Sequence, residues 1–151
     1  MIEVEVKADA WTKALPEVET VTLKAAEAAL ETVEGGGSFA ILLTDDETLR
    51  ELNARFLGKD KPTNVLSFPA PANPDRHLGD IALAYGVCAR EAGEQGKTLS
   101  QHLSHLTVHG VLHLLGYDHQ DDGEAEAMEA VERAVLEALG VPDPYAVELE
   151  R

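Results

Sequence analysis

The sequence predicts an α+β fold: one domain over residues 1–151, in which a small mixed sheet of about four strands packs with about five helices. Two observations predict this class. Strand patterns and helical patterns are mixed in the first half of the chain, whereas the part after about residue 86 carries helical patterns alone. The chain also has 151 residues, 44% of them hydrophobic and 26% charged, which is enough for a single core.

The first three elements follow from the spacing of apolar residues. The segment IEVEV at 2–6 alternates apolar and charged residues, which predicts a half-buried strand. Apolar residues recur at helical spacing over 16–33, where a proline suits the first turn and three consecutive glycines end the helix. The segment SFAILLT at 38–44 then predicts a second strand with an apolar centre.

The middle of the chain predicts one helix and two further strands. Thr44, with Glu47 three residues later, fits a capping box that begins a short helix ending near Phe56. A basic loop follows, and NVLSF at 64–68 predicts a strand. Beyond a proline-rich loop, LGDIALAY at 78–85 predicts the last strand.

Helices account for the remainder of the chain. We expect one over about 86–95, one from a cap at Thr98 or Ser100 to Leu115, and one over about 122–139. The sequence contains no internal repeat, long linker or low-complexity tract that would divide it into further domains.

The charge is strongly acidic and unevenly placed. A net charge of −16 argues against broad binding to a polyanion, so a nucleic-acid site must be local. Glutamates crowd the last predicted helix, whereas cations cluster over residues 50–61. The glutamates are Glu124, Glu126, Glu129, Glu132 and Glu137, and the cations are Arg50, Arg55, Lys59 and Lys61.

The sequence also predicts a compartment. The single cysteine, Cys88, excludes an internal disulfide and fits a reducing environment. The first residues, MIEVEVKADAW, have neither the basic start nor the apolar core of a signal peptide. No stretch approaches the roughly 20 apolar residues that a membrane span needs. We therefore expect a cytoplasmic protein.

The segment HGVLHLLGYDH at 109–119 predicts a metal site. His109 and His113 are four residues apart on one predicted helix, so their side chains lie about 5–6 Å apart at Cβ and can converge on one ion. His105 cannot be the third ligand, because it lies about 12 Å along the helix axis from His113. Gly116 allows a left-handed turn that brings His119 back to the pair.

Three histidine ligands suit zinc, or less often nickel, copper or iron. They leave one coordination position open, as in catalytic sites, whereas structural zinc usually has four protein ligands. Zinc proteases share the spacing but place a glutamate after the first histidine, and Gly110 occupies that position here. A protease is therefore the less favoured reading, and phosphodiester cleavage remains open. Asp118, beside His119, could orient an imidazole or act as a base.

Three blocks of sequence together resemble the YbeY family of bacterial endoribonucleases: GKDKPTNVLSFP at 58–69, LGDIALA at 78–84 and HGVLHLLGYDH at 109–119. The resemblance extends over nearly the whole chain. It implies one α+β domain and one Zn²⁺ per chain, held by His109, His113 and His119. It also implies a single-strand-specific endoribonuclease of ribosome biogenesis, active in 3′-end maturation of 16S ribosomal RNA and in ribosome quality control. The implied partners are ribosomal RNA, the small ribosomal subunit, one of its proteins and a ribosome-assembly GTPase.

The chain departs from the family at one position. Family members usually carry an arginine directly before the GKD-like loop, and here that position is Leu57. Arg55 could take over its role only if the helix ends before Gly58, since two residues are 200° apart on a helix. We expect Arg55 and the substrate-binding residues on the metal side, with the glutamate-rich helix facing away from RNA. The expected substrate-binding residues are Lys59, Lys61, Asn64 and Ser67.

The alternative to an enzyme is a ribosome-assembly factor that binds RNA or protein and uses its metal only structurally. Leu57 gives this alternative weight, because a missing arginine weakens the case for cleavage of RNA.

Overall fold

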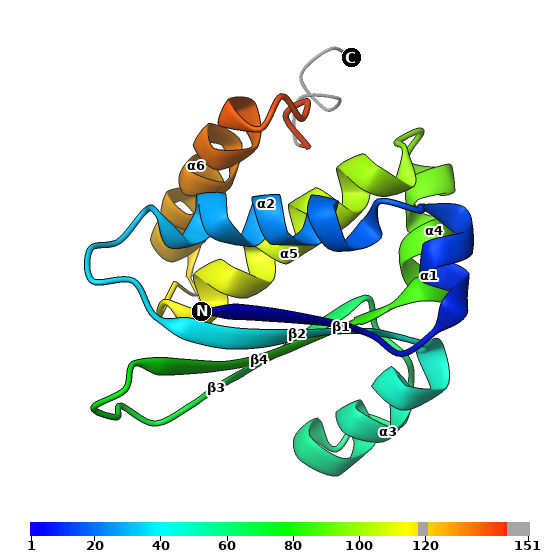
Figure 1. Cartoon of the computed structure of the whole chain (residues 1–151), viewed down its shortest axis with the longest axis horizontal. Coiled ribbons are helices and arrows are strands. Elements are labelled where there is room, and N and C mark those ends of the chain that lie inside the picture. Colours follow the sequence, from blue (N-terminus) through cyan, green and yellow to red (C-terminus); the bar gives the residue numbers. More distant parts are fainter. Residues whose placement is uncertain (118–120, 145–151) are drawn as a thin grey trace.

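The computed structural model describes residues 1–117 and 121–144, and within them the chain forms four strands and six helices (Figure 1). The α+β prediction is confirmed, with one helix more than expected. No described helix is long and apolar enough to cross a membrane. In chain order the elements are β1 (Ile2–Val6), α1 (Asp9–Ala14), α2 (Val18–Leu30), β2 (Ser38–Thr44), α3 (Asp46–Leu57), β3 (Val65–Pro69), β4 (His77–Ala84), α4 (Tyr85–Glu94), α5 (Leu99–Leu114) and α6 (Asp122–Ala138).

The strands form one mixed sheet in the order β1-β2-β4-β3. Strands β1 and β4 both pair in parallel with β2, and β3 pairs antiparallel with β4. The antiparallel pair sets the sequence NVLSFP beside LGDIALA, so that Ser67 lies opposite Ile81. Two of the three sequence blocks that resemble the YbeY family are therefore neighbours in the sheet.

Helices cover both faces of the sheet unequally. Helices α2 and α5 lie on one face, α6 packs on α5, and α3 lies on the opposite face (Figure 1). Because side chains alternate along a strand, Phe39, Ile41 and Ile81 point into the main core under α2 and α5. Ala82 points the other way and joins a smaller apolar cluster with Leu49 of α3.

Side chains at the helix ends fix where two helices begin. Helix α5 begins at Thr98 with a full capping box: the Thr98 hydroxyl accepts from the Gln101 N–H, and the Gln101 side chain accepts from the Thr98 N–H, both at 3.1 Å. The predicted cap of α3 is wrong by one residue. Asp45 caps it by accepting the Thr48 N–H at 2.8 Å, because Thr44 still belongs to β2.

Candidate metal centre

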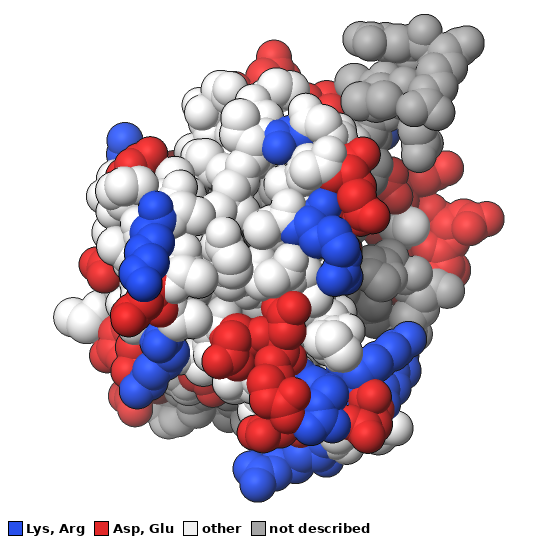
Figure 2. Space-filling view, turned by 90° about the vertical axis from the view of Figure 1, so that its right-hand side faces the viewer, with Lys and Arg blue, Asp and Glu red and all other residues white. Residues whose placement is uncertain are grey.

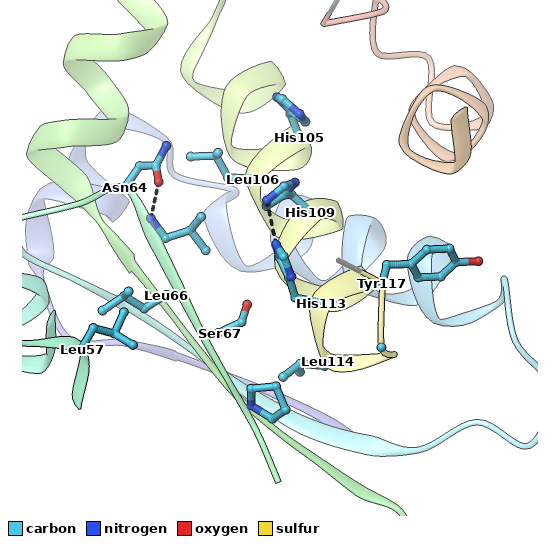
Figure 3. A pocket seen from close by; sticks show the side chains of 13 residues that line it. Leu57, Asn64, Leu66, Ser67, His105, Leu106, His109, His113, Leu114 and Tyr117 are labelled. Carbon is cyan, nitrogen blue, oxygen red and sulfur yellow. Dashed lines mark hydrogen bonds between the residues drawn. The ribbon is translucent and has the colours of Figure 1, made fainter. Parts of the chain in front are cut away.

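Helix α5 brings two of its histidines into contact near its C-terminal end. The Nε2 atoms of His109 and His113 are 3.1 Å apart, and the ring centroids are 4.6 Å apart. Both side chains are half-buried and line a cleft (Figure 3). Two imidazoles bound to one tetrahedral zinc at about 2.0–2.1 Å have nitrogens about 3.3 Å apart, so this pair fits a shared ion.

The other two histidines of α5 point at carboxylates. His102 is buried, and its Nε2 lies 2.9 Å from Oε1 of Glu91. Burial lowers the pKa of His102, and the hydrogen bond to Glu91 opposes that shift. The Nε2 atom of His105 lies 2.9 Å from Oε2 of Glu132, and its ring centroid is 6.4 Å from that of His109. The structure therefore pairs His109 with His113 rather than with His105.

Glu132 reaches the same histidines from α6. Its side chain is 1% exposed, and Oε1 lies 2.7 Å from Nδ1 of His109. Glu132 is thus buried, whereas Glu124, Glu126 and Glu137 of the same helix are exposed. The sequence did hold a signal, because Glu132 shares helical spacing with the buried residues Met128, Val135 and Leu136. An acid within an apolar stripe marks a buried carboxylate that needs partners.

The end of α5 turns the chain as its glycine predicts. Gly116 has φ of 102°, and its N–H donates to the carbonyl of His113 at 3.1 Å. The Tyr117 N–H donates to the carbonyl of Leu112 at 3.0 Å, which completes a Schellman motif. The turn is the geometry that a returning third ligand requires.

The remaining residues of the predicted centre lie outside the described part of the chain. These are His119, the predicted third ligand, and Asp118. Within residues 1–117 and 121–144, no three potential ligands gather closely enough to hold a metal. The only thiol, Cys88, is buried, and burial raises its pKa, which keeps it protonated and unsuited to zinc.

The histidine pair opens on a cleft of about 710 Å³ between α5, β3 and the end of α3 (Figure 3). Its described walls are mainly apolar, with leucines from three elements, and contain no lysine or arginine. Besides the histidines and Tyr117, two polar side chains line these walls. The Ser67 hydroxyl donates to the carbonyl of Gly110 at 3.1 Å, and the Asn64 amide donates to Glu91 at 3.0 Å. Two of the four predicted substrate-binding residues, Asn64 and Ser67, therefore line the cleft.

Gly110 is where α5 touches the sheet. A Cβ atom there would lie 3.2 Å from Ser67 Oγ, 3.2 Å from Ile81 Cγ2 and 3.3 Å from Ile81 Cδ1. A glutamate, as zinc proteases carry at this position, has no room between the helix and the strands. The packing therefore accounts for the glycine at the position where the protease alternative needs a carboxylate.

We expect alanine at Gly110 to destabilise the protein although alanine favours helix. The tight contacts with Ser67 and Ile81 should cost more than the helix propensity returns, a net loss of about 1 kcal/mol in the free energy of unfolding. Gly93, a helical glycine of α4 with open space around it, is the matched control, and Gly93→Ala should stabilise by about 0.5 kcal/mol. Urea unfolding measures both. Equal stabilisation by the two changes would show that the contacts of α5 with Ser67 and Ile81 are not tight.

The end of α3 places Leu57, rather than Arg55, at the cleft. Helix α3 continues to Leu57, and Gly58 caps it with φ of 70°. Leu57 lines the cleft opposite the histidine pair (Figure 3). Arg55 stays helical, with its guanidinium 6.0 Å from the ring centroid of Phe56, and is not among the residues of the cleft wall. The condition under which Arg55 could replace the family's arginine is therefore not met.

Two lysines lie on the loop that joins α3 to β3, between the cleft residues Leu57 and Asn64. Lys59 and Lys61 are exposed there and do not line the cleft itself. Arg50 is held by ion pairs with Glu47 and Asp60. On the face that Figure 2 presents, basic and acidic side chains of the described residues lie in small mixed groups and form no continuous basic track. On this face, a contact with RNA phosphates would be local, which agrees with the expectation from the net charge.

Comparison with known proteins assigns the family. The model of the family described as Endoribonuclease YbeY matches residues 2–140. The chain belongs to the YbeY endoribonuclease family. A relative from Rhodopseudomonas palustris named Endoribonuclease YbeY is 54% identical, over 95% of this chain and 80% of its own length. A relative from Nitrobacter winogradskyi with the same name is 53% identical, over 95% of this chain and 81% of its own length.

A solved structure supports the fold. The solution structure of a protein from Thermotoga maritima has a TM-score of 0.61 to this chain and 26% sequence identity, and the match covers 95% of each chain. The family that three separated sequence blocks predicted is thus confirmed, together with its single-sheet α+β architecture.

Proposed function

We propose that this chain is a zinc-dependent, single-strand-specific endoribonuclease of ribosome biogenesis, which matures the 3′ end of 16S ribosomal RNA and takes part in ribosome quality control. Membership of the YbeY family supports hydrolysis of RNA, because its curated relatives are named endoribonucleases. Partners in this proposal are ribosomal RNA, the small subunit, one of its proteins and an assembly GTPase, all in the cytoplasm.

The observation that carries the proposal is the 3.1 Å approach of the His109 and His113 Nε2 atoms on the wall of the cleft. These imidazoles would hold the ion together with His119, the ligand expected from the sequence. A bound zinc ion supplies Lewis-acid chemistry, since it polarises a phosphate oxygen and activates water. Asp118 is expected to orient an imidazole or to accept a proton.

The cleft favours a single strand over a duplex. Its walls are mainly apolar, which suits the unstacked base faces of a single strand. Ser67 and Asn64 add polar groups on the same walls. Lys59 and Lys61, on the exposed loop beside it, would contact phosphates.

Removal of the metal should abolish cleavage. We expect chelated protein to cut single-stranded RNA more than about 100-fold more slowly, and one equivalent of zinc to restore the rate. A duplex of the same sequence should resist cleavage throughout. The assay pairs metal analysis with gel-resolved RNA products. Activity that survives complete removal of zinc would contradict the proposal.

A second candidate is a ribosome-assembly factor whose metal is structural. The observation that favours it is Leu57 on a cleft wall without a described cation. In that case zinc removal would lower the melting temperature and RNA binding, and the zinc-loaded protein would cut neither single-stranded nor duplex RNA.

A further inference from the structure

Glu132 is a carboxylate enclosed between two histidines of another helix. Its side chain is 1% exposed, with Oε2 at 2.9 Å from Nε2 of His105 and Oε1 at 2.7 Å from Nδ1 of His109. Both oxygens are thus engaged by imidazoles one turn apart on α5. Enclosing a carboxylate is costly, and the cost is offset only where its hydrogen-bond geometry is good.

The hydrogen bonds determine which nitrogens of His109 carry hydrogen. With Glu132 ionised, its oxygens can only accept, so the nitrogens that face it are donors. In a neutral His109 this places the hydrogen on Nδ1 and leaves the lone pair on Nε2. That Nε2 is the atom 3.1 Å from Nε2 of His113. The Glu132 contact and the approach of the two histidines are consequences of one ring orientation.

Anchoring of α6 to α5 does not by itself call for a carboxylate here. The buried side chains of Met128, Val135 and Leu136 already join α6 to the main core. An apolar residue at 132 would extend that stripe without enclosing a charge. The Glu132 carboxylate instead places an acceptor at Nδ1 of His109, the ring nitrogen that faces away from His113. Its other oxygen contacts His105.

We propose that Glu132 is a positioning residue of the metal centre: it fixes His109 in the tautomer and ring orientation that present Nε2 to the ion, while His105 holds the carboxylate in place. The inference rests on the proposed function, because it requires an ion at His109 and His113. A carboxylate behind a ligand imidazole also raises the basicity of the coordinating nitrogen. None of this requires Glu132 to touch the ion or the RNA.

The test is a zinc dissociation constant, measured by competition with a chromophoric chelator. Glu132→Gln keeps the size of the side chain but replaces one acceptor oxygen with an NH₂ donor, so it cannot accept from both histidines. We expect its zinc affinity to fall by about 10- to 100-fold. Glu137→Gln makes the same charge change at an exposed site of the same helix and should match the wild type. His113→Ala should bind no zinc at the site.

A second measurement uses the wild-type protein, so it does not depend on whether a Glu132 variant folds. Long-range ¹H–¹⁵N spectra of the zinc-free wild type, assigned with single histidine variants, should show His109 with hydrogen on Nδ1. Hydrogen on Nε2, or wild-type zinc affinity in Glu132→Gln, would overturn the role of Glu132 while the metal centre stands. If instead the wild type binds no zinc, or His113→Ala binds it equally well, the proposed function fails and the role of Glu132 fails with it.

Discussion

His113→Ala is expected to lose stoichiometric zinc and to cut single-stranded RNA more than about 100-fold more slowly than the wild type. The loss should exceed the 10- to 100-fold typical of removing a group behind a ligand, because the substitution removes a nitrogen that is itself proposed to bind the ion. The fold should survive, since His113 is only half-buried near the end of α5 and alanine is the best helix former. Metal analysis, circular dichroism and cleavage rates together measure these expectations.

His77→Ala is the matched control for that experiment. His77 is exposed on β4 and lies outside the cleft, so its removal changes the histidine count without touching the centre. Zinc content and cleavage should both equal those of the wild type. If His113→Ala kept its zinc, or cleaved RNA at the control's rate, the histidine pair would not be the seat of the chemistry.

Sequence patterns predicted those parts of the fold that depend on local spacing. Strand alternation and the glycine stop at Gly116 are each set by a few neighbouring residues, and the structure has both. The same holds for the cap of α5, where the structure uses Thr98, one of the two candidates with Ser100. Helix α1 was not predicted, because six residues are too few to show a helical period. Its place is fixed by a distant contact instead: Trp11 is fully buried and its indole N–H donates to the carbonyl of Thr44 at 2.9 Å.

In the candidate site, too, features set by local spacing could be predicted from the sequence, whereas features set by distant contacts could not. The approach of His109 and His113 follows from their spacing on one helix, so the sequence was sufficient for it. The partnership of Glu132 with both His105 and His109 joins residues 27 and 23 positions apart in the chain, which no local pattern can supply. The position of Leu57 on the cleft wall likewise depends on how α3 is set against β3, although its substitution for an arginine was visible in the sequence.

Leu57→Arg is expected to raise the rate of cleavage of single-stranded RNA, because it places a cation on a wall that has none among its described residues. Leu57 is 55% exposed at the last turn of α3, so a longer side chain can be accommodated without loss of core packing. A preorganised donor aimed at developing negative charge is worth about 10²–10³ in kcat, which is the upper limit for this change. The gain should therefore appear in kcat rather than in KM.

The experiment must separate electrostatic attraction of RNA by the added arginine from stabilisation of the transition state. Any added arginine strengthens RNA binding, and does so most at low salt, so both kinetic constants are measured at one fixed salt concentration. Leu23→Arg is the matched control, since it makes the same substitution at an exposed leucine of α2, away from the cleft. That control can lower KM but should leave kcat unchanged. If the two variants behave alike, or if only KM changes in Leu57→Arg, position 57 attracts RNA without serving the chemistry, because an interaction made only in the transition state must raise kcat.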